Sequence, residues 1–283
     1  MPVNQVVVMD SGFAGLNSGI KCEIIESTNE RINAFNRVIS QLLPGLVSQT
    51  TCLTYRVICP QLTRVEHLSS LAKLVPQLAD ENSRLQSCIQ ISGLIIIPGV
   101  LPDQGRLVRE SSTELLSARL HRRSKQIRLR VRNNYLVDEA CLIKETFELH
   151  YRLKPQLTPS TLVVSFKPDI FDTKLSIDET GLYSYMAIQS NPDRASIDYV
   201  YATQKLSCPG LLVPIDLVGL LLLALAQQKM PERQVESFEY HVYGQLYTRQ
   251  VIRLCATALG ERQILVWAEI DGNLVYRGVI NLR

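Results

Sequence analysis

The run from Leu217 to Ala226 is apolar without interruption, and it constrains the fold of this chain more than any other feature. Pro214 and Asp216 lie just before it. Its length is about half of what a helix needs to cross a bilayer. The run therefore predicts a helix buried in a protein core, and we expect no membrane span.

The residues after this run alternate between apolar and polar, which is typical of half-buried strands. Phe238, Tyr240 and Val242 fall on one face of the first predicted strand. Residues 264–270 and 274–280 predict a hairpin around Asp271-Gly272, a dipeptide that suits a type I′ turn. The order of loop, long apolar helix and a meander of four strands predicts one helix wrapped by an antiparallel sheet.

Residues 25–153 repeat this order more weakly. Ser27 and Glu30 form a capping box, helical spacing follows to Leu43, and Pro44-Gly45 ends the helix. A second helical pattern covers residues 65–84. Residues 89–97 predict a strand, and residues 105–153 predict three strands with a turn at Asn133-Asn134.

Prolines punctuate residues 154–168, which makes this segment the best candidate for a linker. The predicted organisation is an N-terminal unit at 1–153, the linker at 154–168 and a C-terminal unit at 169–283. The two units have similar size, so a pseudo-dimer of related units is expected. The sequence contains no convincing internal repeat to support this.

Composition excludes several classes of function. The net charge of +3, from 30 basic and 27 acidic residues, is too balanced to imply a nucleic-acid partner by itself. Seven cysteines include no CxxC pair, and the four histidines are scattered, so no metal site is predicted. The sequence has no Gly-rich phosphate loop or nucleophile elbow, and we expect no cofactor. The first twenty residues have no basic side chain and resemble neither a secretory signal nor an Arg-rich transit peptide.

Local charge is concentrated in residues 119–132, which contain seven basic residues and no acidic one. Within this segment the apolar residues alternate with Arg128, Arg130 and Arg132, so these three guanidinium groups are expected on one face of a strand. Two interpretations remain open. The row binds phosphates, an acidic carrier protein, another protein or RNA, or it belongs to an edge strand that is kept soluble by charge.

Three segments of the C-terminal unit resemble the MaoC-like and type 2 hydroxyacyl-thioester dehydratases: residues 182–202, 208–226 and 238–278. The match covers about 100 residues well and is weaker upstream, at residues 145–152. The resemblance implies an α+β fold, a double hot dog in which two helices are each wrapped by a curved antiparallel sheet.

In that family an Asn or Asp, and a His five residues later, activate water at a trans-2-enoyl or 3-hydroxyacyl thioester. By resemblance these two catalytic positions are Asn191 and Ser196, and neither side chain can serve as a base near neutral pH. A further family His is replaced by Asp193. Asp193 and Asp198 are therefore candidates for a rearranged acid/base pair, although the Asp198 position is more plausibly structural.

The helix start that would bind substrate in the family is also changed. The family's His-Gly before the helix is Pro214-Ile215 here, and Asp216 follows. Ile215 and Asp216 thus occupy substrate-binding positions, and the negative Asp216 would repel a developing enolate. The nearby tyrosines either line an acyl channel or pack in the structure; they are Tyr183, Tyr185, Tyr199 and Tyr201.

These substitutions predict a dehydratase-derived protein that has lost the reaction. It would act in acyl-thioester or acyl-carrier binding, with Arg128, Arg130 and Arg132 as further contacts, or as a scaffold subunit of a larger assembly. The alternative is an active 3-hydroxyacyl-thioester dehydratase with a rearranged site. The resemblance implies mitochondrial type II fatty acid synthesis. The N-terminal residues give this location no support, so a cytoplasmic location stays open as the alternative.

Overall fold

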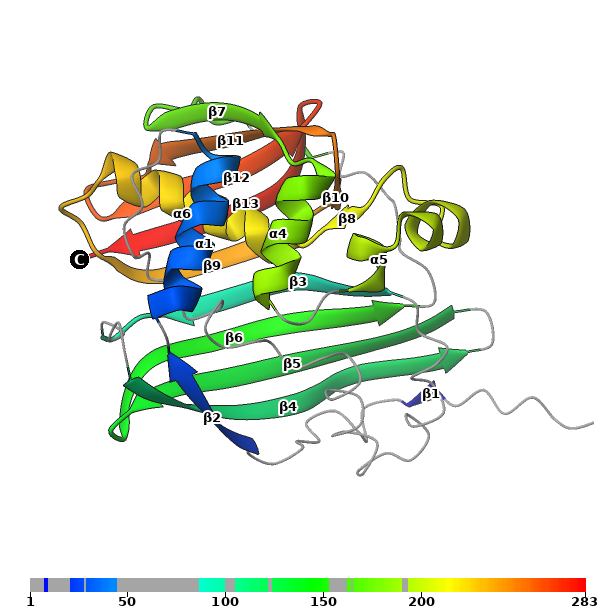
Figure 1. Ribbon diagram of the computed structural model, residues 1–283, viewed down its shortest axis with the longest axis horizontal. Helices are drawn as coiled ribbons and strands as arrows, with labels where there is room; N and C mark the ends of the chain where they lie inside the picture. Colours follow the sequence, from blue (N-terminus) through cyan, green and yellow to red (C-terminus); the bar gives the residue numbers. More distant parts are fainter. Residues whose placement is uncertain are drawn as a thin grey trace, which may run out of the picture.

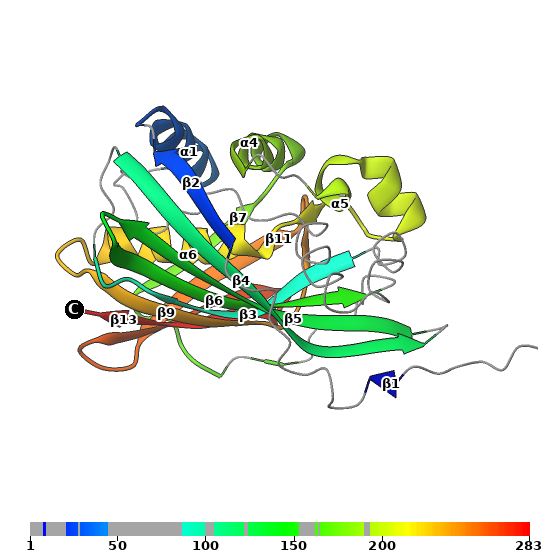
Figure 2. The same ribbon diagram turned by 90° about the horizontal axis from the view of Figure 1, so that it is seen from below.

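The computed structural model describes residues 8–9, 21–27, 29–44, 87–99, 105–121, 124–152, 162–163, 165–189 and 193–283. The predicted helical pattern at 65–84 lies outside these residues. Helices cover one side of a large curved sheet, as Figures 1 and 2 show. The elements of the N-terminal half are β1 (Val8–Met9), β2 (Lys21–Ser27), α1 (Asn29–Leu42), β3 (Ser87–Ile96), β4 (Gly105–His121), β5 (Ser124–Val137) and β6 (Ala140–Arg152).

The C-terminal half contains the long apolar helix and most of the short elements. They are β7 (Phe171–Ser176), α4 (Glu179–Gln189), α5 (Arg194–Ile197), the π-helix η2 (Tyr201–Lys205), β8 (Leu212–Val213), α6 (Ile215–Lys229), β9 (Val235–Val242), β10 (Leu246–Tyr247), β11 (Val251–Ala258), β12 (Gln263–Ile270) and β13 (Asn273–Leu282). No helix in the described ranges has both the length and the hydropathy that a membrane crossing requires.

The main sheet has eleven antiparallel strands, in the order β1-β4-β5-β6-β3-β9-β13-β12-β11-β7, with β2 also paired to β4. Pairing of β3 with β9 joins the two halves into one continuous sheet. The predicted α+β architecture is therefore confirmed. The strands after α6 do not form a simple four-strand meander, because β9 pairs with β13, whereas β11, β12 and β13 follow one another.

Helix α6 lies against the inner face of the C-terminal strands, and all its residues from Leu217 to Ala226 are buried. Phe238, Tyr240 and Tyr276 stack on the sheet beneath it. A Cβ at Gly219 would lie 2.6 Å from the Tyr276 hydroxyl, so this position needs glycine for α6 to approach the sheet. The predicted burial of this helix is confirmed.

The N-terminal half follows the sequence prediction in part. Helix α1 and strand β3 are confirmed, and residues 105–152 do form three strands. The predicted turn at Asn133-Asn134 is wrong, because both residues lie inside β5. Asn133 is buried there and accepts a 2.6 Å hydrogen bond from Ser111 on β4, while its Nδ2 donates to Glu145 on β6 at 3.0 Å.

The described part of the predicted linker lies against the outer face of the C-terminal strands. The Leu162 carbonyl accepts a hydrogen bond from the Leu274 amide, and the ring of Phe166 lies 6.4 Å from that of Trp267. Arg277 stands over the Phe166 ring. This segment therefore contributes to covering Trp267. The division into units at 153 and 169 stays a prediction.

Candidate functional site

The segment that the sequence predicts to hold the catalytic positions lies between α4 and α6. In Figures 1 and 2, α5 and the turns after it stand at one end of the molecule, beyond the start of α6. Strand β8 pairs with β10 directly before α6 and thereby fixes where the helix begins. Residues 193–216 are thus held as a group of short, well-defined elements.

Ser196 is buried within α5, and only 1% of its surface is exposed. Asp193 is exposed and acts as the N-cap of the same helix, since its Oδ1 accepts a 2.9 Å hydrogen bond from the Ala195 amide. Asn191 lies outside the described residues. Ser196 and Asp193 are therefore close in the chain, but Ser196 is turned into the core.

Asp198 forms the link between α5 and η2. Its Oδ1 accepts a hydrogen bond from the Tyr201 amide, and its Oδ2 accepts two from the Arg194 guanidinium at 2.9 and 3.0 Å. The Tyr201 amide, and then Arg194, lower the pKa of Asp198 below its ordinary value. A carboxylate held in this way is a weaker base, which fits the structural role that the sequence favours for this position.

Asp216 lies in the first turn of α6, next to Ile215, and both are half-buried. The buried Tyr185 on α4 donates a 2.7 Å hydrogen bond to Asp216 Oδ2 and accepts one of 2.7 Å from Gln189. The hydroxyl at 185 thus joins α4 to the start of α6. From the sequence, Tyr185 was expected either to line an acyl channel or to pack in the structure, and this hydrogen bond was not foreseen. The spacing of Tyr185 and Gln189, one helical turn apart, was the available signal for this hydrogen-bonded pair.

The four tyrosines of this segment do not share one environment. Tyr185 is buried, Tyr201 is half-buried beneath Arg194, and Tyr183 and Tyr199 are exposed.

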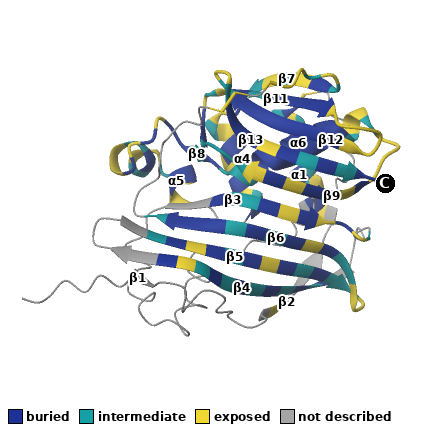
Figure 3. Ribbon diagram, turned by 180° about the vertical axis from the view of Figure 1, so that it is seen from behind, coloured by how far each residue is buried: buried dark blue, intermediate teal, exposed yellow. Residues whose placement is uncertain are grey.

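Arg128, Arg130 and Arg132 do project from one face of β5, as predicted, while Ile127, Leu129 and Val131 are buried on the other. Figure 3 shows this alternation along β5. The interpretation as an edge strand is wrong, because β5 pairs with both β4 and β6. The row faces away from α6, so the structure does not bring it together with Asp216.

We call Arg128, Arg130 and Arg132 the arginine row. Acidic residues on the neighbouring strands compensate its positive charge. Glu148 on β6 pairs with Arg128 at 2.7 Å and Arg130 at 2.9 Å, and Glu114 on β4 pairs with Arg132 at 2.7 Å. Burial raises the pKa of Glu148, but hydrogen bonds from Arg130 and Arg128 outweigh it, and the pKa lies below its ordinary value. Two carboxylates on β4 and β6 therefore offset most of the charge of these three arginines.

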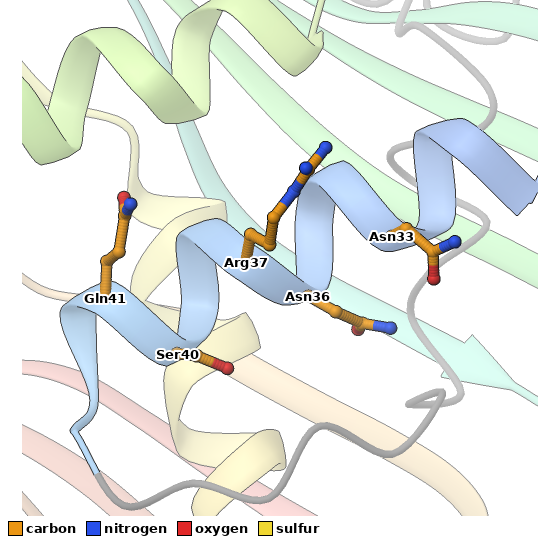
Figure 4. A pocket seen from close by; sticks show the side chains of 5 residues that line it. All are labelled: Asn33, Asn36, Arg37, Ser40 and Gln41. Carbon is orange, nitrogen blue, oxygen red and sulfur yellow. The ribbon is translucent and has the colours of Figure 1, made fainter.

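A concavity of about 470 Å³ lies along the polar face of α1, lined by Asn33, Asn36, Arg37, Ser40 and Gln41 (Figure 4). None of the residues singled out from the sequence lines it. In the described ranges, no three His, Cys, Asp or Glu side chains gather in a way that would hold a metal ion.

Comparison with known families agrees with this geometry. The model of the family "hydroxyacyl-thioester dehydratase type 2" matches residues 108–248, which run from β4 to the residue after β10. The chain belongs to the hot-dog dehydratase family. A comparison with curated protein sequences found no match.

Solved structures of the hot-dog family share the fold. A MaoC-like dehydratase from Phytophthora capsici has a TM-score of 0.65 at 9% identity, with 94% of this chain and 95% of that chain covered. HtdX from Mycobacterium tuberculosis has a TM-score of 0.60 at 12% identity, with coverage of 93% and 99%. The peroxisomal multifunctional enzyme type 2 from Drosophila melanogaster has a TM-score of 0.59 at 12% identity, and the match covers 93% of this chain and 48% of that chain.

The polar groups of the segment from α5 to α6 fall into two kinds. Asp193 and Asp198 satisfy backbone amides, and Ser196 is in the core. Asp216 is the carboxylate in the first turn of α6. Its Oδ1 has no hydrogen-bond partner among the described residues, in contrast to Asp193 and Asp198.

Proposed function

We propose that this hot-dog protein binds acyl thioesters, free or attached to a carrier protein, without dehydrating them. Ser196 carries the proposal: by the sequence resemblance it corresponds to the family's catalytic His, and it is 1% exposed. A neutral hydroxyl in the core can neither remove the α-proton of a thioester nor protonate its leaving hydroxyl. A role as a scaffold subunit of a larger assembly is compatible with the same loss.

The acidic side chains nearby do not replace the missing base. Asp193 caps α5, and Asp198 is held by the Tyr201 amide and Arg194. Moving either carboxylate toward a substrate would break its hydrogen bond to a backbone amide of the same segment. These two groups therefore support the local fold.

The test uses purified protein and two measurements. We expect no hydration of trans-2-enoyl-CoA above the uncatalysed rate, and saturable calorimetric binding of octanoyl-CoA, which cannot be hydrated. Clear turnover would refute the loss of catalysis, and absence of octanoyl-CoA binding would refute thioester binding. Free CoA serves as the control for contacts with the nucleotide portion alone.

A second candidate is an active 3-hydroxyacyl-thioester dehydratase of mitochondrial type II fatty acid synthesis with a rearranged site. The open Oδ1 of Asp216, fixed by Tyr185 at the start of α6, favours it. In this case the carboxylate would take the α-proton and return it to the departing hydroxyl as water leaves. Turnover that is abolished by Asp216→Asn and retained by Asp193→Asn would support this candidate. Subcellular fractionation tests the mitochondrial location.

The arginine row is the proposed contact for an acidic carrier protein or an RNA backbone. Glu114 and Glu148 offset two of its three charges, so the salt dependence of binding should be modest. Changing Arg128, Arg130 and Arg132 to Gln should weaken co-purification of a partner at low salt. Arg277→Gln, on β13, is the control, and an identical partner list for both variants would contradict a contact role.

A further inference from the structure

Three basic side chains adjoin one another on the face of β5 and β6 that is turned away from α6; Figure 3 shows these two strands side by side. Arg128 and His150 lie directly opposite each other, and Arg152 follows two residues further along β6. The Arg152 Nε–H donates a 3.3 Å hydrogen bond to His150 Nε2. Arg128 and Arg152 are diagonal neighbours, and the Cα atoms of such neighbours lie about 7–8 Å apart. We call these three residues the Arg–His cluster.

The charged groups around the Arg–His cluster do not neutralise it. Glu148 accepts hydrogen bonds of 2.7 Å from Arg128 and 2.9 Å from Arg130, so its single charge is divided between two strand positions. The residue opposite His150 on β3 is the uncharged Ile89. Glu148 therefore balances at most one of the two arginine charges of the cluster.

Arg128 has donors left for a further acceptor. A guanidinium group has five N–H groups, and within the described part of the chain only Nη2 of the Arg128 side chain makes a hydrogen bond. This side chain is 45% exposed, so an acceptor can reach it from solvent. Such an acceptor meets the His150 ring and the Arg152 guanidinium directly beside it.

A terminal phosphate group fits this arrangement better than a carboxylate does. It has three terminal oxygens and a charge of about −1.5 to −2 at pH 7, so it can accept hydrogen bonds from two guanidinium groups at once. A carboxylate has two oxygens and a single charge. A phosphodiester of a nucleic-acid backbone likewise has two terminal oxygens and a single charge.

We propose that the Arg–His cluster binds a terminal phosphate group, either inorganic phosphate or a phosphate monoester. Arg128 and Arg152 hold the phosphate oxygens, and the His150 ring lies beside them. Burial, then Arg152 and Arg128, lower the pKa of His150 to about 4, and the bound anion raises it because a nearby negative charge favours the imidazolium. The proposal concerns a face away from α6 and does not depend on thioester binding.

The experiment is a titration of the full chain with sodium phosphate at constant ionic strength near pH 7, followed by the NMR signals of the histidine rings. The His150 signals should shift and saturate, with a dissociation constant of about 1 mM. Arg128→Gln should raise this constant about fivefold or more. Arg132→Gln is the matched control: Arg132 is 44% exposed on the same strand face and also pairs with a glutamate at 2.7 Å, but Thr146 lies opposite it. This control should leave the constant within about twofold.

Two esters distinguish the sources of the phosphate. Methyl phosphate, a monoester, should also saturate the site, and the tighter of methyl phosphate and inorganic phosphate identifies an ester or free phosphate as the ligand. Dimethyl phosphate, which represents a nucleic-acid backbone, should bind about fivefold more weakly or worse. Dimethyl phosphate that binds equally well would overturn the proposal in favour of a nucleic-acid contact.

Circular dichroism checks that each variant is folded, and Arg152→Gln provides a second variant that must also weaken phosphate binding. His150 signals that do not saturate with phosphate would overturn the proposal. An equal loss of binding in Arg128→Gln and Arg132→Gln would do the same, because it would mean a general attraction to the sheet face. At saturating phosphate, a pKa of His150 that stays at about 4 would also contradict a site beside this ring.

Discussion

His150 makes the stability of this protein sensitive to acid. It lies on β6, 9% exposed, and the Arg152 Nε–H donates a 3.3 Å hydrogen bond to its Nε2. Burial, then the charges of Arg152 and Arg128, lower the pKa of His150 from 6.5 to about 4. The folded protein therefore keeps this ring neutral through a pH range in which an unfolded chain protonates it.

The sign and size of the effect follow from proton linkage. Because the unfolded state binds more protons between pH 6.5 and 4, the free energy of unfolding falls as the pH falls through that window. The separation of the two pKa values gives a loss of about 3 kcal/mol at pH 4, and little further loss below it. Above pH 6.5 this contribution is fully retained.

Urea denaturation at a series of pH values from 7.5 to 4 measures this loss. His150→Gln keeps a hydrogen-bond acceptor for Arg152 but cannot titrate, so its free energy of unfolding should fall by about 3 kcal/mol less than that of the wild type. His241→Gln is the control, because the His241 side chain on β9 is exposed. A native-state NMR titration of His150 near its ordinary value of 6.5 would refute the reasoning.

Three further predictions concern the interior. Gly219→Ala should lower the free energy of unfolding by about 1–3 kcal/mol through overpacking. Gly260→Ala is the control and should not lower it, because a Cβ at that position meets nothing within 4 Å. Thermal denaturation compares the two variants. Tyr185→Phe should cost about 1–2 kcal/mol in urea denaturation, because Asp216 loses its donor, and an unchanged midpoint would contradict this link. Ser196→His should lower the melting temperature without restoring hydratase activity, since the site is filled; a gain of activity would mean that the pocket is intact.

The parts of the fold that the sequence predicted are those with a local cause. The hairpin of β12 and β13 follows from Asp271 and Gly272, which take positive φ values of 50° and 78°, as a type I′ turn requires. The burial of α6 follows from the apolar composition of the helix itself. Neither feature depends on a residue far away in the chain.

Position 133 shows where local reasoning fails. An Asn-Asn pair often marks a turn, but here Asn133 is buried and bonded to Ser111 and Glu145, which lie 22 and 12 residues away. A buried amide is tolerated because these partners satisfy it. Only the pairing of three strands reveals them, and the sequence alone does not provide that pairing.

The arginine row extends the same argument from structure to function. Counted along the chain, residues 119–132 contain only cations, and this count suggested a strongly charged contact surface. Across the sheet, Glu114 and Glu148 stand between the arginines, because β4 and β6 flank β5. The potential that a partner meets depends on the sum over neighbouring strands, so binding at this face must come from geometry as much as from net charge. In a sheet protein, a run of like charges therefore becomes a functional prediction only after its cross-strand neighbours are known.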